Sequence, residues 1–465
     1  MYAIKEDPNG NIIHKARFVA RGYSQEYGKD YADTFSPTAR LESVRIAMQV
    51  SAQNNYSVHQ MDVKSAYLHA PIDRELYVEQ PEGYQQVGEN GEKLVWRLNK
   101  SLYGLKQSGR NWNLLVHKFF IDKQFTQSLV DPCVYTYQKS DGTVIVLIWV
   151  DDFVICSSVS NLMNDVKNAL KNTFRMKDLG PIKYFLGIEI SQSGDCISMS
   201  QSMYLKSVLK RFEMDQCKGR STPCETNPSV YEVDAEVVEH DISLYREMVG
   251  SLVYAVCCTR PDLSFAVTKL SQHLAAPRNC DWIMLKHVFR YVKATVDNKL
   301  IYRKNPDRLR LSAFSDSDWA SCKDDRRSVT GYCFSLSATG PAVTWKSRKQ
   351  RTVALSSCEA EYMAMATATQ EALYLLQLLE DMTGVRQETV EIQCDNQGSI
   401  LLAENPVKHD RSKHIDIRFH FLRTHVQNGN VSFQYVPSGE NLADIFTKPC
   451  SKRKLTEFTG LLFGV

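Results

Sequence analysis

The segment TVIVLIWVDDFVIC, residues 143–156, places two adjacent aspartates in the middle of an apolar run. Burying one ionised carboxylate is costly unless a partner neutralises it, and two neighbouring carboxylates raise each other's pKa. Asp151 and Asp152 could form the exposed turn of a β-hairpin, which such a pattern favours, although the pair lacks the glycine that two-residue hairpin turns usually require. Alternatively, they could bind a divalent cation such as Mg²⁺, which prefers oxygen ligands.

Length and composition restrict the class of protein. A chain of 465 residues, 43% of them hydrophobic, predicts two to four folded domains. The net charge is only +3, so any affinity for nucleic acid must come from local basic patches. No uninterrupted apolar run has transmembrane length and the N-terminus lacks the apolar part of a secretory signal, so we expect no membrane partner. The 13 cysteines include no Cys-x-x-Cys pair, which favours reduced thiols over a disulfide framework.

Apolar periodicity divides the chain into three parts. Residues 1–223 mix short apolar strands with amphipathic helices, and the acidic segment CETNPSVYEVDAEVVEHD, 224–241, is typical of a linker. The pattern is helical from about 245 to 295 and strand-rich from about 300, with one long helix at about 358–381. We therefore predict a large α/β domain, a small helical connector and an α+β domain.

A third acidic candidate lies upstream, in VHQMDVKSAYLHAPI, residues 58–72. Asp62 follows a short strand-like run there, and it meets Asp151 only if the fold brings two strands together. Three such carboxylates could hold two magnesium ions about 4 Å apart. Two such ions can activate an attacking hydroxyl and stabilise the leaving group in a phosphoryl transfer.

At these residues the chain resembles the reverse transcriptase of copia-type retrotransposon polyproteins. The blocks occur in the family's order: HKARFVARGYSQEYGKDYADTFSPTAR (14–40), QMDVKSAYLHAPI, LYVEQPEGY (76–84), LNKSLYGLKQSGRNW (98–112), WVDD and KDLGPIKYFLGIEI (177–190). The resemblance implies a right-hand polymerase with fingers and palm, in which Asp62, Asp151 and Asp152 are the catalytic carboxylates. It also reconciles the two readings of the Asp pair, because in this family the pair lies at the turn of the catalytic hairpin.

The resemblance also implies nucleotide-binding residues. Tyr67 matches the aromatic that excludes a ribose 2′-hydroxyl, although its residue type fits an ordinary core aromatic too. The other implied residues match the fingers strand over the triphosphate and the loop beside the base: Lys15, Arg17 and Arg21, then Gly104 and Lys106. A solvated basic face is the plainer reading of the three cations. The chain departs from the family at Gly109, where proline is usual, and at Trp149, where tyrosine is usual.

A second set of acids lies in the C-terminal half. Asp316 and Asp318 end the strand-like segment LSAFSDSDW, 311–319, and a long helix follows. Helical steps from Glu361 reach an apolar face made by Met365, Ala368, Ala372, Leu375 and Leu379, whereas steps from Glu359 reach Gln370 and Gln377. Glu361 is therefore the carboxylate that the periodicity places toward the core. Asp395 follows a predicted strand, and Asp444 lies where a loop enters a helix.

The blocks FSDSDWA, SSCEAEYMA, CDNQGSI, KHIDIRFHFLR and ENLADIFTKP resemble the ribonuclease H domain of the same polyproteins. The implied catalytic and metal-binding set is Asp316, Glu361, Asp395 and Asp444, with Asp318 as the alternative to Asp316. Two Mg²⁺ ions per active site, or Mn²⁺ instead, would support hydrolysis. The loop VPSGEN lacks the histidine that many ribonucleases H carry, so product release or proton transfer is expected to differ.

Histidines and basic residues could touch substrate phosphate. His409, His414 and His420 alternate with Asp410 and Asp416 at a spacing that is unconvincing for zinc, so we interpret them as a basic element near phosphate or as ordinary surface and core residues. The runs WKSRKQR (345–351) and SKRK (451–454) could also neutralise phosphates, which would make binding salt-dependent.

The expected organisation follows from both resemblances. The fold is α+β and multidomain: an N-terminally truncated fingers and palm domain (1–223), an acidic linker with a helical thumb or connection (224–305), a ribonuclease H-like α/β domain (306–450) and a basic tail (451–465).

The implied function is RNA-directed DNA polymerisation, a nucleotidyl transfer, with degradation of the RNA strand of the hybrid. The expected partners are an RNA template, a DNA primer, the RNA–DNA hybrid and dNTPs, with a homodimer left open and integrase and capsid encoded elsewhere. The expected location is a cytoplasmic virus-like particle, with the nucleus as the alternative. Because part of the fingers is expected to be missing, a catalytically inactive nucleic-acid-binding remnant is the alternative function.

Overall fold

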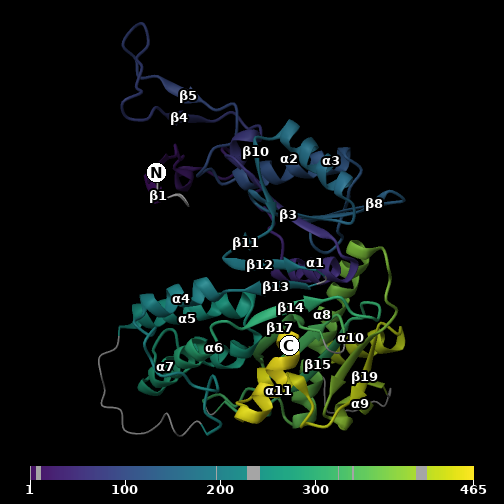
Figure 1. The fold of residues 1–465 in the computed structure, drawn as a ribbon. Coiled ribbons are helices and arrows are strands. Elements are labelled where there is room, and N and C mark those ends of the chain that lie inside the picture. The colour runs from purple at the N-terminus through teal and green to yellow at the C-terminus, as the bar shows by residue number, and fades with distance from the viewer. Residues whose placement is uncertain are drawn as a thin grey trace. The chain divides into compact units, whose positions relative to one another are not determined.

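The computed structural model describes residues 2–6, 12–194, 196–227, 241–322, 324–337, 340–404 and 416–465. The chain forms two compact units (Figure 1). The first comprises Met1–Arg40 and Ser57–Pro181, and the second comprises Leu41–Tyr56 and Ile182–Val465. His409, His414 and most of the predicted linker lie outside the described residues.

The first unit is built on a six-stranded antiparallel sheet. In sheet order its strands are β10 (Met176–Pro181), β3 (Ser57–Val63), β9 (Asp152–Ser157), β8 (Gly142–Trp149), β7 (Val134–Lys139) and β6 (Thr126–Gln127). Two small hairpins belong to the same unit: β1 (Tyr2–Glu6) with β2 (Ile12–Ala16), and β4 (Tyr77–Glu79) with β5 (Val95–Arg97). Its helices are α2 (Ser108–Asp122) and α3 (Ser160–Thr173), with single turns η1 (Gly22–Ser24) and η2 (Ala66–His69).

Helices α2 and α3 cover one face of this sheet. Phe120 of α2 stacks on Phe153 of β9, with ring centroids 6.3 Å apart, and Lys167 of α3 lies 2.5 Å from His59 of β3. Successive side chains of a strand point to opposite faces. Asp62, three residues after His59, and Asp152, next to Phe153, therefore lie on the face opposite to these helices.

The second unit contains a four-stranded antiparallel sheet and a group of helices (Figure 1). The sheet order is β11 (Tyr184–Phe185), β12 (Ile188–Ser193), β13 (Cys196–Ser200) and β14 (Lys299–Arg303). The helices are α1 (Leu41–Asn54), α4 (Ser202–Arg211), α5 (Ile242–Cys258), α6 (Ser264–Ser271) and α7 (Asn279–Ala294), with the single turn η4 (Pro261–Leu263).

Helix α1 belongs to the second unit although its neighbours in sequence belong to the first. Arg45 is only 2% exposed and donates to the carbonyls of Val343 (2.6 Å), Cys257 (2.8 Å) and Cys258 (3.0 Å). Its guanidinium also lies 4.2 Å from the ring centre of Trp345. Because of these contacts, and because β13 pairs with β14, the division after Pro181 differs from the boundary expected near 223.

The second unit also holds a five-stranded mixed sheet. Its order is β17 (Ala342–Lys349), β16 (Val329–Ser335), β15 (Ser312–Ser317), β18 (Val390–Cys394) and β19 (Val431–Tyr435), with β15, β18 and β19 parallel. The long predicted helix is confirmed as α8 (Ser357–Thr383), which packs against β15, β16 and β18. The remaining elements are α9 (Gln397–Glu404), α10 (Asp416–Gln427), η5 (Leu442–Phe446) and α11 (Lys452–Phe463).

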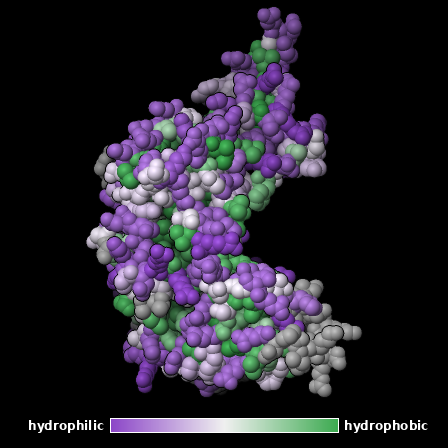
Figure 2. Space-filling view, turned by 90° about the vertical axis from the view of Figure 1, so that its right-hand side faces the viewer, coloured by the Kyte–Doolittle hydropathy of each residue, from purple (hydrophilic) through white to green (hydrophobic). Residues whose placement is uncertain are grey.

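The surface of each unit is mainly polar on the face drawn in Figure 2. Among the helices of the described residues, none combines the length and apolarity needed to cross a membrane. All 13 cysteines are free thiols.

Candidate active sites

The strand register of the first unit brings its three predicted acids together. Asp62 of β3 pairs directly with Asp152 of β9, and Asp152 also pairs with Trp149 of β8. The hairpin between β8 and β9 therefore turns at Val150 and Asp151, one residue earlier than the Asp pair itself. The backbone carbonyl of Asp151 accepts a hydrogen bond of 2.8 Å from the amide of Val63, which ties the turn to β3.

The turn has an unusual backbone. Val150 has φ = 55°, a left-handed conformation that is rare for a β-branched residue. Its carbonyl accepts a hydrogen bond of 2.6 Å from the indole of Trp112, which is buried on α2. Strained residues of this kind persist only where the surroundings hold them, and they cluster at functional sites. The missing turn glycine was therefore a signal of strain rather than of the absence of a hairpin.

The electrostatics of this site favour a bound cation. Burial raises the pKa of Asp152, a hydrogen bond from Gln60 opposes that change, and the charges of Asp151 and Asp62 raise the pKa further. The amide nitrogen of Gln60 lies 3.0 Å from Oδ1 of Asp152 and orients this carboxylate. A divalent cation would remove the repulsion that raises this pKa.

Two tyrosines and an arginine gather near the turn. The rings of Tyr67 and Tyr103 lie 4.8 Å apart, and the guanidinium of Arg17 lies 5.3 Å from the ring centre of Tyr103. Burial, followed by the charge of Asp151, raises the pKa of both phenols. The structure therefore brings Arg17 and Tyr67 together near Asp151. Tyr103 was not among the residues predicted from the sequence, although it adjoins the predicted residue Gly104.

The other residues predicted to bind nucleotide have plainer surroundings. Arg21 is exposed, and the side chain of Lys15 is not among those the structure describes. Gly104 has φ = 93°, and a Cβ there would lie 2.1 Å from the carbonyl oxygen of Ala20, so this glycine permits a close backbone approach. Lys106 donates to the hydroxyl of Tyr31 at 3.1 Å. Binding of nucleotide by these residues stays a prediction.

In the second unit, three of the four predicted acids form a compact cluster. Asp316 lies near the end of β15, Glu361 on the first turns of α8, and Asp395 immediately after β18. One carboxylate oxygen from each lies within 4.8 Å of the other two. Asp316 is 1% exposed and Glu361 is 5% exposed, so both carboxylates have lost most of their water.

These carboxylates fit a divalent cation. Burial raises the pKa of Asp316 to about 7, with Lys448 opposing the change and Asp444 and Asp395 adding to it. Burial, followed by the charges of Asp316 and Asp395, raises the pKa of Glu361 well above its ordinary value. Oε2 of Glu361 is buried and has no hydrogen-bond partner in the described part of the chain. An orphaned oxygen among mutually repelling acids is the environment that a hard cation stabilises.

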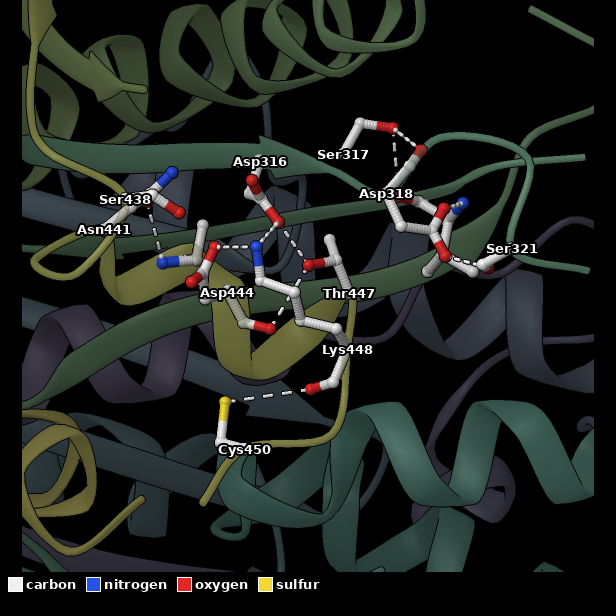
Figure 3. A network of polar contacts seen from close by, with 12 residues as sticks. Asp316, Ser317, Asp318, Ser321, Ser438, Asn441, Asp444, Thr447, Lys448 and Cys450 are labelled. Carbon is white, nitrogen blue, oxygen red and sulfur yellow. Dashed lines mark hydrogen bonds and ion pairs between the residues drawn. The ribbon is translucent and has the colours of Figure 1, made fainter. Parts of the chain in front are cut away.

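The fourth acid, Asp444, is paired with two lysines, of which Lys448 is labelled in Figure 3. Nζ of Lys448 lies 2.7 Å from Oδ1 of Asp444 and 4.0 Å from Oδ2 of Asp316. Lys454 donates to Oδ2 of Asp444, and the hydroxyl of Thr447 donates to Asp316. Although burial opposes the effect, the carboxylates of Asp316 and Asp444 raise the pKa of Lys448 to about 12.

The turn that carries Asp444 is anchored to the central strand. The side chain of Asn441 caps η5 by accepting from the amide of Ala443 at 3.1 Å. Its Nδ2 donates to the carbonyl of Ser315 at 3.1 Å. Asn441 therefore holds Asp444 beside β15, a positioning role that sequence analysis missed although the Asn–Leu–Ala–Asp spacing is typical of a helix cap.

The alternatives weighed from the sequence have other roles in the structure. The carboxylate of Asp318 accepts from the amide of Val329 at the start of β16. It also accepts from the hydroxyl of Ser321 in its own loop (Figure 3). Oε2 of Glu359 accepts from the amide of Leu355 at 2.8 Å, at the start of α8. The geometry therefore places Asp316 and Glu361, rather than Asp318 and Glu359, in the acidic cluster.

A basic groove lies between β17 and α8. It has a volume of about 300 Å³ and is lined by Lys346, Arg348, Lys349 and Arg351, which belong to the basic run predicted to meet phosphates. Gln350 connects this groove to the acidic cluster, because its amide donates to Ser317 (3.2 Å) and to the carbonyl of Ala360 (3.0 Å). Of the predicted histidine cluster, only His420 has a described side chain, and it is exposed on α10.

Known proteins resemble this chain along most of its length. Residues 1–226 match the family described as "Reverse transcriptase (RNA-dependent DNA polymerase)". The chain is 35% identical over 98% of its length to the "Retrovirus-related Pol polyprotein from transposon TNT 1-94" of Nicotiana tabacum, covering 34% of that protein. It is 31% identical over 67% of its length to the "Putative transposon Ty5-1 protein YCL074W" of Saccharomyces cerevisiae, covering all of that protein.

The Pol polyprotein from transposon RE2 of Arabidopsis thaliana is 36% identical over 96% of the chain, which covers 30% of that protein. The chain thus spans about a third of the length of the polyproteins it matches. Among solved structures, ribonuclease H1 of Halobacterium salinarum aligns with 30% of this chain and 94% of its own, at 17% identity and a TM-score of 0.24.

Proposed function

Because the chain belongs to the family of copia-type retrotransposon Pol polyproteins, of which it carries the reverse transcriptase portion, we propose that it copies RNA into DNA and degrades the RNA strand of the resulting hybrid. The observation that carries this proposal is that each compact unit holds its own cluster of carboxylates, half-buried at the paired strands β3 and β9 in the first unit and mostly buried at β15 and α8 in the second. Family membership supports the assignment of the first set to nucleotidyl transfer and of the second to hydrolysis.

In the first unit, the paired strands β3 and β9 would hold the reacting groups. Divalent cations, when bound, supply charge neutralisation and activation of a hydroxyl oxygen. Asp62 and Asp152 would hold them from adjacent strands, with Asp151 completing the set from the turn. Gln60 keeps one oxygen of Asp152 oriented through its 3.0 Å hydrogen bond.

The neighbouring tyrosines and arginine would position the nucleotide. The ring of Tyr67, packed on Tyr103 at 4.8 Å, would crowd a ribose 2′-hydroxyl and so favour dNTPs. Arg17 would place a positive charge toward the triphosphate, for which arginine geometry is well suited.

In the second unit, Asp316, Glu361 and Asp395 would hold the cation that favours hydrolysis of the RNA backbone. Asp444 would face the same phosphodiester from η5, held there by Asn441. The basic groove along β17 would neutralise phosphates of the hybrid, so that its backbone crosses the acidic cluster.

The test is primer extension on an RNA template by the full chain, with Mg²⁺ and with EDTA. We expect extension with dNTPs only when Mg²⁺ is present, and we expect Asp152→Asn to abolish it. Asp141→Asn, which removes a carboxylate from the turn between β7 and β8 at the other end of β8, is the matched control and should extend normally. Failure of the folded wild-type chain to extend a primer would contradict the polymerase proposal and favour the inactive nucleic-acid-binding remnant.

A further inference from the structure

The charges of the acidic cluster in the second unit are distributed unevenly, and Figure 3 shows Lys448 between Asp316 and Asp444. On one side, Asp444 has lysine ammonium groups at both of its oxygens. On the other side, Oε2 of Glu361 is buried without a hydrogen-bond partner in the described structure. Lysines of the chain itself therefore neutralise the side of Asp444, whereas the side of Glu361 lacks a counter-charge that a cation from solution could supply.

The two lysines differ in how firmly they are held. Lys454 donates to the carbonyl of Ser438 at 2.7 Å as well as to Asp444, and its ammonium lies 5.1 Å from the ring centre of Phe458. This side chain is 25% exposed, and its several partners hold it in place as a permanent counter-charge.

Lys448 bridges two acids instead. Its ammonium lies 2.7 Å from Asp444 and 4.0 Å from Asp316, so a single positive charge serves carboxylates from η5 and from β15. Its side chain is 43% exposed, and it also lines a cavity of about 270 Å³ together with Thr268 and Gln272. The ammonium therefore has room to turn away from the acids.

We propose that the ammonium group of Lys448 occupies the position of the second divalent cation, between Asp316 and Asp444, until nucleic acid binds. The free protein then takes one cation at Asp316, Glu361 and Asp395, and the second enters when hybrid phosphates draw the ammonium away. The inference rests on the proposed hydrolytic function of this site. It makes Lys448 a positioning residue that couples complete loading of the site to the arrival of substrate.

The experiment counts Mn²⁺ ions bound by the full chain without nucleic acid, by isothermal titration calorimetry. The parent protein carries Asp62→Asn, Asp151→Asn and Asp152→Asn, so that only the second unit contributes. We expect the parent to bind one Mn²⁺ and the Lys448→Met variant of the parent to bind two. Lys452→Met, which removes an exposed positive charge of α11, is the matched control and should bind one.

Two results would overturn the proposal: a parent that binds two Mn²⁺ ions without nucleic acid, or a folded Lys448→Met variant that still binds one. If the Lys448→Met variant does not fold, the parent protein is titrated again in the presence of a hybrid with a 2′-O-methyl RNA strand. The number of Mn²⁺ ions bound by the parent should then rise from one to two. An unchanged count there contradicts the proposal. A parent that binds no Mn²⁺, like its Glu361→Gln variant, would instead refute the hydrolytic site itself.

Discussion

Replacing Asp316 by asparagine should stabilise the metal-free protein at high pH, because the wild-type carboxylate is ionised in a buried and repulsive site. Asparagine keeps the size of the side chain and can still accept from Thr447, but it carries no charge. The pKa of Asp316 is raised from 3.8 to about 7, and each pH unit corresponds to about 1.4 kcal/mol. The cost of ionising Asp316 in the folded state is therefore of the order of 4 kcal/mol.

The sign of the pH dependence follows from proton binding. Between pH 4 and 7 the folded state holds a proton on Asp316 that the unfolded chain has released, so the wild type loses stability as pH rises through this range. The advantage of Asp316→Asn should be small at pH 4 and should grow by about 3 kcal/mol between pH 5 and pH 8. Part of this gain is lost because Lys448 then keeps only Asp444 as its acidic neighbour.

Urea unfolding in EDTA at pH 5 and pH 8 measures this difference, with Asp324→Asn as the control that removes an exposed carboxylate outside the acidic cluster. Added Mg²⁺ should remove the advantage of Asp316→Asn at pH 8 by stabilising the wild type. If Asp316→Asn has the same unfolding free energy relative to the wild type at both pH values, the reasoning is refuted.

Three further variants test other parts of the structure. Arg45→Met should lower the unfolding free energy of the second unit by about 3 kcal/mol, because three carbonyl groups lose a charged donor; a loss under about 1 kcal/mol in urea unfolding would contradict this. Val150→Gly should leave stability unchanged or raise it by about 1 kcal/mol, since glycine adopts positive φ freely; clear destabilisation in a thermal melt would show that the turn is not strained. Arg348→Met should reduce the slope of log affinity for hybrid against log salt by about 0.9 if it contacts one phosphate, and an unchanged slope would exclude that contact.

The sequence predicted the acidic cluster of the second unit well because its residues carry local signals. Glu361 could be separated from Glu359 by helical periodicity alone, and Asp395 follows an apolar strand. The meeting of these residues with Asp316 depends on the parallel pairing of β15 with β18, which periodicity does not reveal. Family resemblance supplied that long-range information for the prediction.

Other features depended on tertiary contacts that no local pattern encodes. Arg45 lies in an ordinary helical segment, and nothing nearby in the sequence indicates that it bonds to carbonyls about 200 and 300 residues away. The turn at Val150 contradicts local propensity and is held by Trp112 from another helix. Lys454 lies in the basic run SKRK, for which the sequence suggested contact with phosphates, and no role was predicted for Lys448, whereas both bind Asp444.

We propose that one chain holds two independent active sites, and one reaction tests this proposal most directly. The full chain would extend a DNA primer on a labelled RNA template with Mg²⁺ while cleavage of the RNA is followed in the same samples, for the wild type, Asp151→Asn and Glu361→Gln. We predict that Asp151→Asn does not extend the primer but still cleaves the RNA of a preformed hybrid. Glu361→Gln should extend the primer but not cleave the RNA. Loss of both activities in either folded variant, or of neither, would contradict the assignment of the two sites.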